Sequence, residues 1–201
     1  MRRPDFLVVG HVTKDLLNGC HCGWQCLLSS ALTAKGLGVR VAVVTAADPD
    51  VDLGPIFQGI DLVCLPSPVT TTFQNLYRGE ERIQFLYARA TPLGLEAVPL
   101  PWRTAPIVHL GPVAQEMGEE MVRLSPHSLL GLTPQGWLRG WDEEGRIHSL
   151  RWERAPEALP QVDVLILSEE DLAGEAGTLR SHLMVPGMAV VTQGAKGATL
   201  Y

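Results

Sequence analysis

The sequence lacks a long apolar run, an excess of positive charge and the common glycine-rich nucleotide signatures. No apolar stretch approaches the roughly 20 residues that a membrane-spanning helix needs. Sixteen basic against twenty-two acidic side chains give a net charge of −6, which disfavours nucleic acid as a partner. Neither Gly-x-x-x-x-Gly-Lys-Ser/Thr nor Gly-x-Gly-x-x-Gly occurs, which argues against the two commonest nucleotide-binding motifs. The first residues lead directly into a short strand-like run without the pattern of a secretory signal, so we expect a cytoplasmic protein with no membrane partner.

Cysteine is scarce, and three of the four cysteines lie close together at Cys20, Cys22 and Cys26. Together with His21 they are a candidate metal site. Structural zinc sites usually separate two short ligand pairs by a longer loop, and four ligands within seven residues fit that spacing poorly. Reduced thiols are the simpler interpretation.

Short apolar runs alternate with helix-forming segments along most of the chain. A strand over 5–10, a helix over 29–37 and a strand over 39–45 form a βαβ unit, which predicts a parallel sheet. Helices are expected over 116–124 and 169–184. Further core strands are predicted over 107–110, 129–132, 162–167 and 188–192, and another begins at 198. At 201 residues, one α/β domain is the default.

One segment breaks this alternation. Residues 70–78 and 82–87 alternate apolar and polar side chains around the polar turn Gly79-Glu-Glu. This pattern predicts a β-hairpin with one wet face, spanning about 68–90 and projecting from the main sheet. An exposed hairpin is also a candidate homodimer surface.

Several segments, taken in order and spacing, resemble the ribokinase-like (PfkB-type) carbohydrate kinases over essentially the whole chain. They are Val8–Asp15, Ala31–Thr45, the hairpin with Gly79–Arg82, Leu167–Leu172 and Val190–Gly197. The resemblance implies an α/β fold, a mostly parallel sheet flanked by helices, as one domain over 1–201 with the hairpin as a lid. It also implies ATP-dependent phosphorylation of a hydroxyl on a sugar, nucleoside or polyol, with ATP and Mg²⁺ as cofactors.

The resemblance assigns the acceptor to the carboxyl ends of the strands, where open α/β sheets bind ligands. Asp15 matches the family residue that hydrogen-bonds sugar hydroxyls; the alternative is a helix N-cap or a solvated turn acid. Thr72 and Asn75 lie on the hairpin and are candidates to face the substrate. A lone histidine such as His109 is more often a structural residue than a catalyst. The full set of candidate acceptor residues is Gly10, Asp15, Thr72, Asn75, His109 and Gly111.

Two further segments match the family's donor side. Ser168 and Asp171 stand where the family has Asn-x-x-Glu, and Asp171 is a candidate to reach Mg²⁺ through water. The alternative is an ordinary N-cap followed by acids in a first helical turn. Thr192, Gly194 and Gly197 match a turn beside the nucleotide, where glycine lets the backbone approach phosphate or ribose; as a lone motif it is also a plain turn.

The sequence departs from the family at its end. The catalytic Gly-Ala-Gly-Asp motif, which supplies an anion hole and the general base, does not occur within the 201 residues. We therefore expect a truncated chain whose general base lies beyond residue 201, with no catalytic residue of its own and no activity by itself. The alternative is an inactive relative that binds a sugar or nucleotide.

The segment between Asp15 and Ala31 is the second departure. The family shows Gly-Gly there, whereas this chain reads Gly19-Cys-His-Cys-Gly-Trp-Gln-Cys-Leu-Leu-Ser29. Shifting the reading frame of 23–29 by one base permits Gly-Gly-Ser-Ala-Tyr-Ser, which is close to the family pattern. A local frameshift and a divergent loop both remain open.

Overall fold

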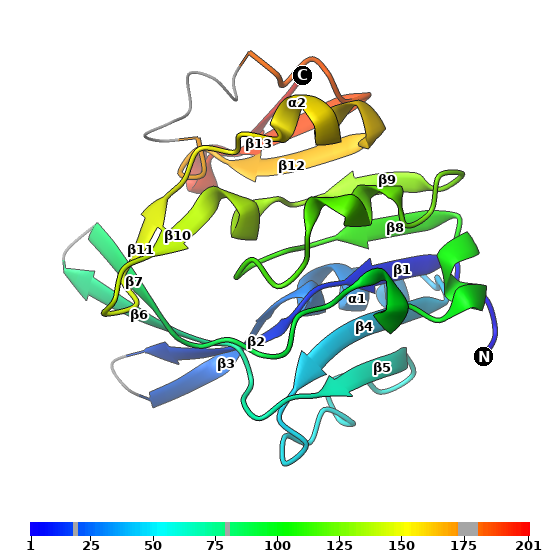
Figure 1. The fold of residues 1–201 in the computed structure, drawn as a ribbon, viewed down its shortest axis with the longest axis horizontal. Coiled ribbons are helices and arrows are strands. Elements are labelled where there is room, and N and C mark those ends of the chain that lie inside the picture. The colour runs from blue at the N-terminus through cyan, green and yellow to red at the C-terminus, as the bar shows by residue number, and fades with distance from the viewer. Residues whose placement is uncertain (18–19, 79–80, 173–180) are drawn as a thin grey trace.

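The computed structural model describes residues 1–17, 20–78, 81–172 and 181–201, with the side chains of 17–27, 78 and 81 left aside. Its main sheet has the strand order β14-β13-β12-β9-β8-β1-β4-β5 (Figure 1). Neighbouring strands are parallel except for β14, which pairs antiparallel with β13. The strands are β1 (Phe6–Val9), β4 (Val41–Ala47), β5 (Asp61–Pro66), β8 (Ile107–Leu110), β9 (Leu129–Leu132), β12 (Val164–Ser168), β13 (Met188–Thr192) and β14 (Ala198–Leu200). The predicted α/β class with a mostly parallel sheet is confirmed.

A second, four-stranded sheet stands away from the main one (Figure 1). It has the order β3-β2-β6-β7, with β2 and β6 parallel and the outer pairs antiparallel. Its strands are β2 (Val12–Leu17), β3 (Cys20–Cys26), β6 (Thr72–Arg78) and β7 (Glu81–Ala88). The predicted hairpin is present as β6 and β7, but the projecting sheet is twice as large as the hairpin alone. We call these four strands the lid sheet.

The chain enters the lid sheet directly from the main sheet. Gly10 follows β1 with a φ of 153°, a conformation that glycine adopts more easily than other residues. The change of direction there leads into β2, which carries Asp15. The cysteines of 20–26 lie on β3, and because their side chains fall outside the described residues, the structure does not test the metal or frameshift hypotheses.

Regular helix is sparse in the described part of the chain. The predicted helix over 29–37 is α1 (Leu27–Gly36), which packs on β1 and β4; a short α2 (Ala155–Ala158) lies near the C-terminal strands. Short 3-10 helices cover Leu95–Ala97, Leu100–Thr104, Glu119–Arg123, Gln135–Leu138, Leu159–Gln161 and Gly194–Lys196. No helix among the described residues is long and apolar enough to cross a membrane.

Two helix predictions are wrong as far as the structure describes them. Residues 116–124 form only the 3-10 helix Glu119–Arg123, because Gln115 adopts a left-handed φ of 53° and the Glu116 carboxylate binds the backbone before it. Of the helix expected over 169–184, residues 169–172 and 181–184 are turns, and 173–180 lie outside the described residues.

The two faces of the main sheet are covered unequally. One face carries the larger core. There, inward-facing side chains of the strands, such as Val108, Leu132 and Leu165, cluster with residues of the connecting segments, such as Trp102. The opposite face is covered around β1 and β4 by α1 and by residues 51–60. A small hairpin, β10 (Arg139–Trp141) with β11 (Ile147–Ser149), leaves the larger core and reaches the lid sheet through the backbone bond from the Leu86 amide to the Gly145 carbonyl, 2.8 Å long.

Candidate functional site

The candidate residues gather at one edge of the main sheet. Because β1, β8, β9, β12 and β13 are parallel, their carboxyl ends share that edge. Gly10, Gly111, Ser168 and Thr192 all lie at or just beyond these ends. The lid sheet begins at the same edge, since β2 follows β1 directly (Figure 1). The acceptor and donor segments that the sequence suggested are therefore on the same side of the sheet.

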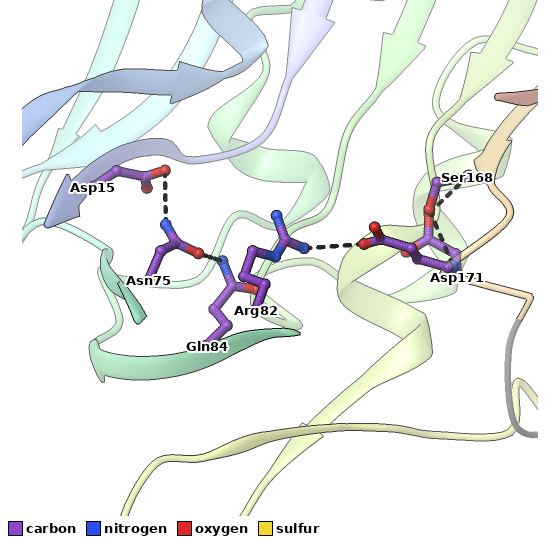
Figure 2. A network of polar contacts seen from close by, with 7 residues as sticks. Asp15, Asn75, Arg82, Gln84, Ser168 and Asp171 are labelled. Atoms are coloured by element: carbon purple, nitrogen blue, oxygen red, sulfur yellow. Dashed lines mark hydrogen bonds and ion pairs between the residues drawn. The ribbon is translucent and has the colours of Figure 1, made fainter. Parts of the chain in front are cut away.

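Asp15 lies in a polar network within the lid sheet (Figure 2). Asp15 is only 4% exposed. The Asn75 amide nitrogen donates to its carboxylate Oδ2 at 3.5 Å. The Asn75 amide oxygen in turn accepts a hydrogen bond of 3.1 Å from Gln84 Nε2. A carboxylate can accept hydrogen bonds from hydroxyl donors at fixed positions.

The network includes one predicted hairpin residue and not the other. Asn75 joins Asp15, whereas the Thr72 hydroxyl donates to the Thr70 carbonyl of its own segment at 2.8 Å. Gln84 was missed by sequence reasoning. Once β6 and β7 are paired, with Asn75 opposite Gln84, the register would have found it.

His109 lines a separate cavity of about 180 Å³ at the end of β8, together with Ser30, Gly111 and Thr133. Its Nδ1 is 3.1 Å from the Ser30 hydroxyl and its Nε2 is 3.1 Å from the Thr133 hydroxyl. Burial of the ring lowers the pKa of His109 to about 4, although part of the residue's surface stays open to the cavity. The imidazole is thus neutral near pH 7 and bonded through both nitrogens, which supports the structural interpretation of this residue.

This histidine should make stability depend on pH. An unfolded chain takes up a proton at His109 below its usual pKa of 6.5, whereas the folded chain resists it down to about 4. We expect the free energy of unfolding to fall between pH 6.5 and 4, by at most about 1.4 kcal/mol per pH unit from this residue. Urea unfolding across that range should show a shallower pH slope in His109→Gln than in the wild type. The exposed His148→Gln serves as control, and parallel curves for the wild type and His109→Gln would contradict the prediction.

Asp171, a candidate for the donor side, is part of a compact turn after β12. Asp171 Oδ2 accepts from the backbone amide of Ser168 at 2.9 Å and from its hydroxyl at 2.7 Å, and the Asp171 amide donates to the Ser168 hydroxyl at 3.0 Å. These reciprocal bonds match the capping alternative. They use only one carboxylate oxygen, Oδ2.

A cavity of about 260 Å³ lies between this turn, β7 and the β10–β11 hairpin. It is lined by Gln84 and Arg82 on the lid side and by Asp171 and Glu170 on the turn, with Arg139 and His148 nearby. Arg82 and Glu170, which both line the cavity, form an ion pair of 3.4 Å. Gln84 thus belongs to the Asp15 network and also lines the cavity that Asp171 lines from the other side. The Arg82–Glu170 pair joins residues 88 positions apart, which no local pattern in the sequence indicates.

The turn over 192–197 requires glycine at two positions because of its backbone conformation. Gly194 has a φ of 57° and Gly197 a φ of 95°, both left-handed, and nothing lies within 4 Å of the Cβ position at either. The Thr192 hydroxyl donates to the Leu167 carbonyl at 3.2 Å, and the Glu169 amide donates to the Thr192 carbonyl at 2.8 Å. The turn is therefore tied to the Ser168–Asp171 turn and presents an open backbone.

The residues present fit a magnesium ion only through water. The described residues contain no group of three or more His, Cys, Asp or Glu side chains that could hold a metal. Mg²⁺ commonly keeps several waters and uses one or two carboxylates, a role open to Asp171.

Comparison with solved structures identifies the architecture. A pyrophosphate-dependent kinase of the ribokinase family, solved with sulfate, matches with a TM-score of 0.82 at 23% identity, covering 98% of this chain and 75% of that chain. The chain has the ribokinase-like fold. A fructokinase from Xylella fastidiosa with bound ATP has the same fold, with a TM-score of 0.69 at 16% identity and coverage of 98% and 71%. So does a sugar kinase from Pyrococcus horikoshii in complex with ATP, with a TM-score of 0.68 at 14% identity and coverage of 98% and 73%.

These structural relatives are kinases, and a fructokinase and a sugar kinase are among them, as the sequence resemblance implied. Another structure of a pyrophosphate-dependent ribokinase-family kinase, with a pyrophosphate analogue and myo-inositol, matches with a TM-score of 0.81 at 23% identity, covering 98% of this chain and 75% of that one. No family model matches the chain, and neither does any curated protein sequence. The ribokinase-like fold therefore rests on structure, while the activity has to be argued from the site.

Proposed function

We propose that this chain forms the acceptor site and part of the donor site of a kinase that phosphorylates a hydroxyl of a sugar or sugar-like polyol. The observation that carries the proposal is the cavity of about 260 Å³ between the lid sheet and the 168–171 turn. Through Gln84, one wall of that cavity connects to the Asp15 network; the other contains Asp171. An acceptor hydroxyl and a phosphoryl donor would meet there on a ribokinase-like fold.

The acceptor side suits an uncharged compound with several hydroxyl groups. Asp15 supplies a buried acceptor, and the amides of Asn75 and Gln84 can each donate and accept. The lid sheet would cover the compound and exclude water from the transferring phosphate. Sugars, nucleosides and cyclitols such as myo-inositol, which one structural relative binds, all present such hydroxyls.

On the donor side we propose ATP with Mg²⁺. The open Gly194–Gly197 backbone suits close approach of phosphate or ribose, and Asp171 would act on Mg²⁺ through water. Two structural relatives were solved with ATP. Pyrophosphate is the second candidate, because other relatives depend on it and because Arg82 and Arg139 line the compact cavity.

In this proposal, residues 1–201 do not supply the general base. The carboxylate of Asp15 is engaged with the lid amide of Asn75, and that of Asp171 caps its own turn. Phosphoryl transfer also needs preorganised donors for the developing charge, and each such donor is typically worth about 10²–10³ in rate. The chain would then bind an acceptor without phosphorylating it, and an inactive sugar-binding relative is the alternative.

Binding and turnover can be separated by experiment. We expect residues 1–201 to bind an acceptor from a panel of myo-inositol, fructose, ribose and adenosine in calorimetry. With ATP or pyrophosphate and Mg²⁺, their turnover should be below about one thousandth of that of the longest product of the gene. Equal turnover would place the base within this chain. No binding and no turnover of any panel compound by either product would refute the kinase proposal.

We also propose the lid sheet as a contact surface for a second copy of the chain. Tyr77 on β6 and Tyr87 on β7 are each 58% exposed, and tyrosine is enriched at protein interfaces.

A further inference from the structure

Glu116 is the most completely buried acidic residue in the described part of the chain, and the proposed reaction does not use it. It lies on the loop after β8 and has no exposed surface. A buried carboxylate is costly unless its oxygens accept hydrogen bonds, so its partners indicate why it is there.

Both carboxylate oxygens accept hydrogen bonds from backbone amides. Oε1 accepts from His11 at 3.0 Å and from Val113 at 3.1 Å. Oε2 accepts from Val113 at 2.9 Å and from Ala114 at 2.7 Å. The left-handed φ of 53° at Gln115 turns the chain so that Glu116 reaches back to its own loop. One side chain thus joins the β8 loop to the connection between β1 and β2.

The same point fixes the other connections of the lid sheet. The Glu116 carbonyl accepts from the Leu93 amide, beyond β7, at 2.7 Å. The His11 ring is 2.7 Å from the Thr71 hydroxyl through Nδ1 and 2.9 Å from the Thr91 carbonyl through Nε2. The Thr71 hydroxyl also accepts from the Ala90 amide at 3.0 Å. The segments entering β2 and β6 and leaving β7 therefore meet around His11 and Glu116.

We propose that Glu116 is a positioning residue that sets the lid sheet against the sheet edge and so places Asp15 and Asn75 over the cavity. Its catalytic relevance rests on the proposed kinase function, but the positioning itself does not. Four N–H···O contacts to one carboxylate hold two loops that flank the site, 105 residues apart in sequence at His11.

Glu116→Gln tests this with almost no change in shape. Glutamine has one acceptor oxygen, so in either orientation its NH₂ group faces a backbone N–H that the carboxylate now accepts. We expect amide hydrogen exchange to become at least about tenfold faster at His11, Val113 and Ala114 and across β6 and β7, without ligand. Thr71→Val, which removes the hydroxyl from the same cluster, should give the same pattern over β6 and β7 and serves if the first variant does not fold.

Asp163→Asn is the matched control at the opposite edge of the sheet. Asp163 Oδ2 accepts from the Leu130 amide at 2.7 Å, and asparagine keeps one oxygen that can accept this bond, so any faster exchange should stay near Leu130 and leave the lid sheet unchanged. Exchange that stays slow in β6 and β7 of both Glu116→Gln and Thr71→Val would overturn the proposal. So would a uniform acceleration that includes β12 and β13.

Activity then separates this proposal from the proposed function. In the longest gene product, Glu116→Gln should lower kcat/KM by about tenfold or more for any panel acceptor that the wild type phosphorylates, with Asp163→Asn within about twofold. If the wild type phosphorylates no panel compound, the kinase proposal fails while the exchange pattern still decides the role of Glu116.

Discussion

Asp15→Asn is expected to lower kcat/KM for the acceptor by about 10²–10³ in the longest gene product. The carboxylate would accept two substrate hydroxyls, and hydrogen bonds to a charged group contribute about 1.5–3 kcal/mol each. Water cannot easily replace them, since Asp15 is only 4% exposed. Asparagine keeps the size but loses the charge and one acceptor. Calorimetry on residues 1–201 should show the same loss as weaker acceptor binding.

Asp61→Asn is the matched control for this change. Asp61 is exposed and begins β5, at the edge of the sheet opposite the site. It should leave acceptor binding and thermal stability unchanged. If Asp15→Asn folds and binds the acceptor as tightly as Asp61→Asn, then Asp15 is only a strand residue and the acceptor site lies elsewhere.

Most strands of the central sheet could be predicted because burial on both faces produces a recognisable sequence, whereas the half-exposed β5 was missed. β4 is buried along its whole length, and residues 41–44 form a continuous apolar run. The same reasoning located β1, β8, β12 and β13. The β6–β7 hairpin was found from the opposite pattern, in which alternating polarity reflects one covered and one wet face.

β2 of the lid sheet escaped prediction because one of its two partner strands is distant in sequence. β2 contains Lys14 and Asp15 and has no clear period; it becomes a strand by pairing in parallel with β6, about 58 residues further on, where Lys14 lies opposite Thr72. The failed helix over 116–124 has a similar cause. Its pattern is helical, but the Glu116 side chain accepts hydrogen bonds from backbone amides of its own loop and of the connection between β1 and β2.

The candidate site was predictable in its parts and not in its connections. Asp15 and Asn75 were identified separately, and the structure brings them together. Their link to the donor side runs through Gln84 and the Arg82–Glu170 pair, which depend on the lid register and on a contact across 88 residues. His109 was placed at the correct edge, but the two hydroxyl partners that bond its ring come from α1 and from the segment after β9.

Gly136→Ala should strongly destabilise the fold near the site. A Cβ on Gly136 would lie 2.6 Å from the Val113 nitrogen, 2.7 Å from the Pro112 carbonyl carbon and 2.8 Å from the Ala114 nitrogen. These are backbone atoms and cannot rotate away, so the loop after β8 has to move. Overpacking of this kind costs about 1–3 kcal/mol, and occasionally more, and we expect the upper end.

We expect a loss of stability at the upper end of this range, because the displaced Val113 and Ala114 amides donate to the Glu116 carboxylate. Moving Val113 and Ala114 weakens their hydrogen bonds to the Glu116 carboxylate. Because this carboxylate also accepts from the His11 amide, the strain reaches the lid sheet. A loss of about 3 kcal/mol would lower Tm by roughly 6–12 °C for a chain of this length. Gly131→Ala is the control, because its Cβ would meet its nearest atom, the Val108 carbonyl oxygen, at an ordinary 3.8 Å. Equal melting temperatures for the two variants would show that the loop after β8 yields freely, and that Glu116 does not hold it.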